Sequence, residues 1–189
     1  MALFRMQQIE IPVLKGQNFI LRTAQASDAS SLVGLARDPT IHKMYGGSAA
    51  ALEPPYNEIE AQQWVKGIMD QPCAWVIDVG IVIGTARLDG IDLQDRRASY
   101  AIGIHSPEWL GKGIGTEATN LVLGFAFTTL QLHRISLRVI AYNTRAIRSY
   151  EKSGFVVEGL EREAGFVDGE WHDDVMMGIL DREFEKLNR

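Results

Sequence analysis

Three glycines at alternate positions, Gly111, Gly113 and Gly115, mark the stretch of the chain best suited to hold an anion. They follow an apolar run, 98–104, that is typical of a strand, and they lead into 116–130, where apolar residues recur at helical spacing. The first N–H groups of a helix have no partner inside it and carry partial positive charge, and glycine lets a ligand approach the backbone. The pattern therefore predicts an anion site, although a tight turn in which glycine only supplies a positive φ would look the same.

The spacing of these glycines excludes two common nucleotide-binding loops. No Gly-Lys-Thr or Gly-Lys-Ser triplet closes the turn, as a triphosphatase loop requires, and the dinucleotide pattern G-x-G-x-x-G is not matched. Residues 110–155 carry six basic and two acidic side chains, a net +4 within a chain of net charge −5. A basic segment in an acidic protein indicates a small anionic ligand rather than a nucleic-acid partner, which needs a broader basic face.

Three segments together resemble the GNAT family of N-acetyltransferases. They are WLGKGIGTEA at 109–118, HRISLRV at 133–139 and NTRAIRSYEKSGF at 143–155. The likeness is closest to the branch that contains ribosomal-protein N-terminal and polyamine acetyltransferases, and it extends over residues 19–180. The three segments in this order and spacing are far more specific than the glycine turn alone.

The resemblance implies an α+β fold with a central mixed β-sheet, flanked by helices and splayed between strands 98–104 and 133–140. It implies acetyl-CoA as co-substrate, bound in the splay, and no metal. The pyrophosphate would lie on the glycine turn, while the pantetheine arm would contact the preceding strand and an asparagine side chain. The cofactor-binding residues implied are Ile102, Ile104, Leu110, Gly111, Lys112, Gly113, Ile114, Gly115, Thr116 and Asn143. Asn143 would also suit a helix N-cap, and Lys112 would equally suit a solvated loop.

Acetyl transfer needs a neutral amine, N–H donors for the developing oxyanion and a proton for the departing thiolate. The resemblance implies that Tyr150 is the catalytic residue that donates a proton to the thiolate. A core tyrosine that only packs its helix against the sheet would occupy the same position. No general base is implied, because Arg138 stands where some relatives carry a glutamate. The candidates left open are His105, at a strand end, and a water chain to Asp89, Asp92 or Asp95.

The function implied is acetyl-CoA-dependent N-acetylation of a primary amine by direct attack on the thioester. The acceptor could be a protein N-terminus, a polyamine or an amino-sugar antibiotic, and a catalytically weak acyl-CoA-binding or regulatory module is the alternative. Residues 40–70 are expected to line the acceptor site, where aromatic and acidic side chains would bind a cationic amine. Those side chains are Tyr45, Tyr56, Trp64, Glu53 and Glu58. We expect no nucleic-acid partner and a monomer or homodimer.

The length of 189 residues fits an N-terminal arm, 1–17, and a single acetyltransferase domain, 18–189. With 46% hydrophobic and 23% charged residues, the composition is that of an ordinary globular protein. Cys73 is the one cysteine, so no intramolecular disulfide is possible. Nowhere do 18 apolar residues stand together, so we expect no membrane span and a cytoplasmic protein.

Periodicity and turn residues predict the elements that position this site. Strands are expected at 19–22, 74–77, 81–88, 98–104, 133–140, 155–157, 164–167 and 171–180, with hairpin turns at 78–80 and 168–169. Helices are expected at 27–37, from Asn57, at 116–130 and from Asn143 to Gly154, with a loop at 40–56 and a polar connection at 89–97.

Overall fold

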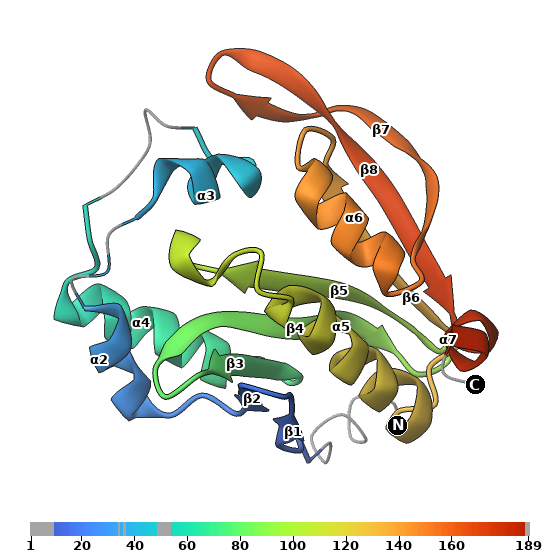
Figure 1. The fold of residues 1–189 in the computed structure, drawn as a ribbon, viewed down its shortest axis with the longest axis horizontal. Helices are drawn as coiled ribbons and strands as arrows, with labels where there is room; N and C mark the ends of the chain where they lie inside the picture. The colour runs from blue at the N-terminus through green and yellow to red at the C-terminus, as the bar shows by residue number, and fades with distance from the viewer. Residues whose placement is uncertain (1–9, 34, 36, 49–53, 188–189) are drawn as a thin grey trace.

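The computed structural model describes residues 10–33, 35, 37–48 and 54–187. An eight-stranded sheet in the order β1-β2-β3-β4-β5-β6-β8-β7 runs through the molecule (Figure 1). The strands are β1 Leu14–Lys15, β2 Ile20–Arg22, β3 Ala74–Asp78, β4 Val82–Asp92, β5 Arg97–Ile104, β6 Arg134–Ile140, β7 Val156–Val167 and β8 Glu170–Leu180. β5 pairs parallel with β6, and the other neighbouring pairs are antiparallel.

The sheet opens between β5 and β6. These strands pair only from Arg97 with Arg134 to Ser99 with Ser136, and beyond Ser99 and Ser136 they diverge. Figure 1 shows the two strands separating from a common end near the C-terminal helix. The predicted α+β fold with a mixed, splayed sheet is therefore confirmed.

Helices cover both faces of the sheet. They are α2 Ala29–Leu32, α3 Pro39–Met44, α4 Glu58–Met69, α5 Ile114–Gly124, α6 Thr144–Lys152 and α7 Asp181–Leu187. The larger apolar core joins α5 and the following residues to the sheet, with Leu123, Ile135 and Met177 fully enclosed. A smaller core lies between α2, α4 and the β3–β4 hairpin. The larger core includes residues of β5, β6 and β8, so it continues across the sheet on both sides of the splay.

Several local signals act as the sequence predicts. Asn57 caps α4 in a capping box, accepting from the N–H of Glu60 at 3.0 Å while the Glu60 carboxylate accepts from the N–H of Asn57 at 3.1 Å. Asp168 and Gly169, with φ of 52° and 88°, turn β7 into β8. Gly154, with φ of 93°, ends α6 in the left-handed conformation typical of that position.

The predicted loop 40–56 is corrected at 40–44 and the predicted helix 27–37 is corrected beyond Leu32, while residues 34, 36 and 49–53 lie outside the described part of the chain. Residues 39–44 form α3, because Asp38 accepts from the N–H of Ile41 at 2.9 Å and Pro39 suits the first helical position. The 27–37 region holds a short 3-10 turn from Ala26 and then α2, which ends at Leu32. Asp38-Pro39 therefore begins a helix.

Several other elements also differ from the expectation. β4 continues through the predicted connection to Asp92. α5 begins two residues early and ends at Gly124, where a π-helical turn, Phe125–Thr129, takes over. The predicted strands 155–157 and 164–167 are the two ends of one long strand, β7, which register shifts interrupt. α7 was not predicted.

The described part of the N-terminal arm, residues 10–17, contacts the sheet. β1 pairs with β2, and the carbonyl of Pro12 accepts from Trp75 Nε1 at 2.9 Å. The N–H of Gln17 donates to Glu117 at 2.7 Å, which joins the arm to α5. Of the helices that the structure describes, none has the length and apolar character to cross a membrane.

Candidate active site

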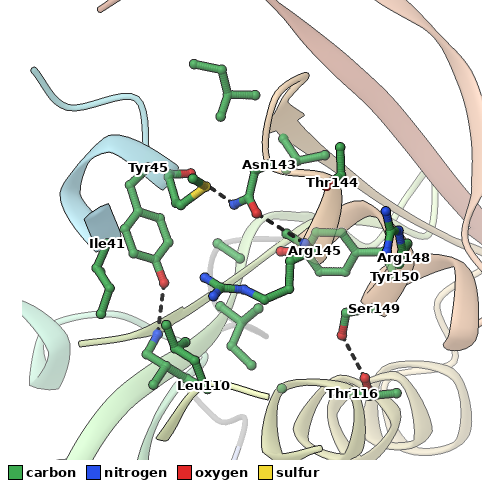
Figure 2. Close-up of a pocket in the computed structure, with 18 of the residues that line it drawn as sticks. Ile41, Tyr45, Leu110, Thr116, Asn143, Thr144, Arg145, Arg148, Ser149 and Tyr150 are labelled. Carbon is green, nitrogen blue, oxygen red and sulfur yellow. Dashed lines mark hydrogen bonds between the residues drawn. The ribbon is translucent and has the colours of Figure 1, made fainter. Parts of the chain in front are cut away.

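A cavity of about 690 Å³ occupies the splay. β5, the glycine turn and the start of α5 line one side, and β6 with α6 lines the other. Figure 2 shows α3 and Tyr45 on one side of the pocket, and Arg145 and Tyr150 of α6 on the other. Nine of the ten predicted cofactor-binding residues line the cavity, and Lys112 is the exception.

The glycine turn has the backbone form of an anion site. Gly111 and Gly113 have φ of 73° and 82°, which side chains strongly disfavour. Gly113 is the N-cap of α5 and has no side chain to satisfy the first N–H groups of the helix. Thr116 Oγ1 lies 2.7 Å from Ser149 Oγ, which ties the start of α5 to α6. The N–H groups of the first helical turn are therefore oriented for an anion.

Basic side chains from α6 complete this end of the cavity. Arg145, Arg148 and Lys152, spaced three and four residues apart, line it along one face of the helix. The ammonium of Lys112 instead lies 4.4 Å from the ring centre of Trp109, in a cation–π contact on the surface. Three cations together with backbone N–H groups fit the phosphate groups of a CoA thioester.

Ile104 and Asn143, two of the residues expected to contact the pantetheine arm, lie at the splay and already have hydrogen-bond partners. The N–H of Ile104 donates to the hydroxyl of Tyr45 at 2.9 Å. Asn143 caps α6 by accepting from the N–H of Ala146 at 3.1 Å, and its Nδ2 donates to the carbonyl of Met44 at 3.1 Å (Figure 2). Asn143 is thus an N-cap that also directs its amide N–H toward the cavity.

Tyr150 combines a core ring with a hydroxyl at the cavity. Its side chain is 8% exposed and makes edge contacts with Tyr100 at 6.5 Å and Phe155 at 5.8 Å between ring centres. Within the described residues, its hydroxyl makes no hydrogen bond, and Tyr150 lines the cavity. Burial raises the pKa of Tyr150, and the nearby Tyr45 raises this pKa further. The phenol is therefore protonated and available as a donor.

The candidate general bases do not line the cavity. His105 does not line the cavity; its ring contacts Trp64 at 5.3 Å between centres, and burial lowers the pKa of His105 to about 4. The three suggested aspartates also lie outside the lining and contact arginines: Asp89 is 2.7 Å from Arg87, and Asp92 and Asp95 are 3.8 and 3.2 Å from Arg97. These groups remain sequence-based candidates without a place at the cavity wall.

Sequence reasoning missed Asp174, the only carboxylate among the described residues that line the cavity. Its side chain is 13% exposed and lies 3.8 Å from Arg138 Nε. Asp174 pairs across the sheet with Ile140, on the face opposite the core residues Leu137 and Val139. Its position depends on the β6–β8 register, so only its place in a strand could be read from the sequence.

The acceptor wall predicted at 40–70 is only partly present at the cavity. Tyr45 lines it, whereas Tyr56, Trp64 and Glu58 do not. Tyr56 instead lies under the guanidinium of Arg37, 4.1 Å from its ring centre. The fifth expected residue, Glu53, lies outside the described residues.

Comparison with known proteins gives concordant matches. The Acetyltransferase (GNAT) domain matches residues 18–156. A spermidine N(1)-acetyltransferase of Vibrio cholerae is 39% identical over 108 residues, or 57% of this chain and 61% of that protein. An uncharacterized N-acetyltransferase, p20 of Bacillus licheniformis, is 34% identical over 177 residues, or 89% of this chain and 96% of that protein.

A solved structure agrees with these matches. The crystal structure of spermidine N-acetyltransferase from Vibrio cholerae in complex with CoA and spermine has a TM-score of 0.73 and 28% identity, covering 90% of this chain and 99% of that chain. The sequence matches to curated spermidine acetyltransferases span only 54–61% of those proteins. The domain match nevertheless covers most of the chain. The chain therefore belongs to the GNAT acetyltransferase family, whose co-substrate is acetyl-CoA.

Proposed function

We propose that this protein transfers the acetyl group of acetyl-CoA to a primary amine by direct attack. The observation that carries the proposal is the splay cavity, where anion-binding N–H groups and basic side chains lie at one end and the Tyr150 hydroxyl lies on the wall. The amine nitrogen would attack the thioester carbonyl, the carbon–sulfur bond would break, the amine would lose one proton, and the thiolate would gain one.

Direct transfer of the acetyl group to the amine is supported by the position of the one cysteine. Cys73 is fully buried and does not line the cavity, and burial raises the pKa of its thiol to about 12. A nucleophilic cysteine needs an accessible thiolate, so an acetylated cysteine intermediate is not favoured.

The acceptor is proposed to enter from the face of the sheet opposite α5 and α6. Arg138, Ile140 and Asp174 lie on that face and line the cavity. The Asp174 carboxylate would attract a protonated amine and hold it before deprotonation, since charge-assisted hydrogen bonds are strong. The relatives that act on spermidine make a polyamine the first acceptor to test.

Thiol release from acetyl-CoA tests the proposal. We expect release to rise well above the background rate with at least one member of a panel containing spermidine, an N-terminal peptide and an aminoglycoside. Mass spectrometry should then show one added acetyl group on the amine. Tight binding of acetyl-CoA without stimulated release from any primary amine would favour the acyl-CoA-binding module instead.

Asp174→Asn should raise the KM for the amine about tenfold, because the hydrogen bond to a cation loses its charged acceptor. The KM for acetyl-CoA should change less than twofold. Glu161→Gln is a matched control, because Glu161 also lies 3.8 Å from Arg138 but is 53% exposed and outside the cavity lining. Equal effects of the two substitutions on the amine KM would contradict a specific role for Asp174.

A further inference from the structure

Residues 39–48, which we call the strap, line the cavity through Ile41, Met44, Tyr45 and Gly46, and Figure 2 shows α3 and Tyr45 opposite Asn143 and Arg145. Two strap residues accept hydrogen bonds from the cavity wall. The Tyr45 hydroxyl accepts from the N–H of Ile104 at 2.9 Å, and the Met44 carbonyl accepts from Asn143 Nδ2 at 3.1 Å. One short segment thus reaches both sides of the splay.

Further contacts outside the cavity hold the strap in place. The carbonyl of Lys43 accepts from the Tyr142 hydroxyl at 2.6 Å. Asp168, in the β7–β8 turn, accepts from Ser48 Oγ at 2.7 Å and lies 3.2 Å from Lys43 Nζ. Tyr142 and Asp168 are not part of the cavity lining, so these contacts hold the strap from outside the cavity.

The N–H of Ile104 faces the splay because of strand geometry. The next N–H, that of His105, donates to the carbonyl of Ile83 on β4 at 2.8 Å, and successive N–H groups of a strand point to opposite edges. Gly103 leaves room for the tyrosine, since a Cβ there would lie 3.2 Å from the Tyr45 hydroxyl. The structure therefore accommodates Tyr45 at a backbone donor of the splayed strand.

We propose that the strap is an internal competitor of acetyl-CoA, in which Tyr45 and Met44 supply acceptors to the Ile104 and Asn143 donors that the substrate would otherwise use. The inference rests on the proposed function, because it takes the splay as the acetyl-CoA site. The Ile104 N–H and the Asn143 amide already have acceptors in the strap, so the strap must leave them before the thioester arm can use these donors.

This competition has a defined effect on affinity. When only the open form binds, the apparent Kd is the intrinsic Kd divided by the open fraction. Loss of one strap hydrogen bond should shift the closed–open equilibrium about threefold to tenfold toward the open form. A weaker strap therefore means tighter acetyl-CoA binding, whereas loss of a direct contact with the substrate would weaken binding.

Titration calorimetry with acetyl-CoA on wild type, Tyr45→Phe and Tyr142→Phe tests the competitor role. Both substitutions keep the ring and remove a hydroxyl that holds the strap, and Tyr142 has no place at the cavity wall. We expect both variants to bind acetyl-CoA about threefold to tenfold more tightly than wild type. Circular dichroism of the unliganded proteins should be unchanged, which shows that the fold is retained.

Unchanged or weaker binding in either variant, with wild type binding normally, overturns the competitor role and leaves the proposed function intact. Weaker binding of Tyr45→Phe alone would make Tyr45 a direct contact of the substrate. If none of the three proteins binds acetyl-CoA, the proposed function fails, and the competitor role fails with it.

Discussion

Tyr150→Phe should lower kcat about 10²-fold and leave the Kd for acetyl-CoA nearly unchanged, because the ring keeps its core contacts while the cavity loses a proton donor. A thiol has an ordinary pKa near 8.5 and a phenol near 10, so proton transfer from Tyr150 to the thiolate is uphill by about 1.5 pKa units before burial is counted. Burial raises the pKa of Tyr150 and widens that gap. We therefore expect an effect at the lower end of the general-acid range of about 10²–10⁴.

Tyr100→Phe is the matched control for this substitution. Tyr100 is also a buried phenol, but its hydroxyl lies 3.1 Å from Thr119 Oγ1 and is engaged there. Single-turnover measurements should show the slow acetyl-transfer step in Tyr150→Phe only. If Tyr150→Phe keeps its kcat, or loses only thermal stability, Tyr150 is a core residue and another group protonates the sulfur.

Gly113→Asp should abolish the thermal stabilisation that acetyl-CoA confers, because it places a carboxylate at the start of α5 where phosphate is expected. At 100 times the Kd, a ligand of the native state adds about 2.7 kcal/mol, or about 5–10 °C in Tm for a domain of this size. A Cβ at Gly113 would meet no atom within 4 Å, so the cost of the substitution lies in the left-handed φ of 82° and not in a clash.

Gly113→Asn separates charge from shape in this experiment. Asn and Asp both tolerate the left-handed conformation of Gly113, and they differ mainly in charge. We expect the neutral variant to keep part of the Tm shift. A full acetyl-CoA response in a folded Gly113→Asp protein would place the phosphate site elsewhere.

Local chemistry made much of the site predictable. The glycine turn and the Asn143 cap depend on backbone rules that act within a few residues, so their positions could be read directly. α3 was not predicted because Asp38-Pro39 directly follows the predicted helix 27–37 and could end it, although an Asp N-cap followed by Pro is also a start signal. Local residues alone do not distinguish the two.

The features of the site that could not be predicted depend on pairing between residues far apart in the chain. Asp174 reaches the cavity only because β8 lies between β6 and β7 in one register, and a shift of one residue would turn it to the other face. The hydrogen bond from the Ile104 N–H to the Tyr45 hydroxyl joins residues far apart in the chain, so no sequence pattern near either residue indicates it. These contacts are consequences of the assembled sheet.

The short pairing of β5 with β6 also governs when the cavity can form during folding. β6 receives its second neighbour only from β8, which lies near the end of the domain, so one wall of the cavity has no antiparallel partner until that strand is in place. Contacts this distant in the chain form slowly because loop closure must precede them. During synthesis on the ribosome, β1–β5 therefore emerge before β8, and the β6 wall of the cavity is completed only after the β7–β8 hairpin has been made.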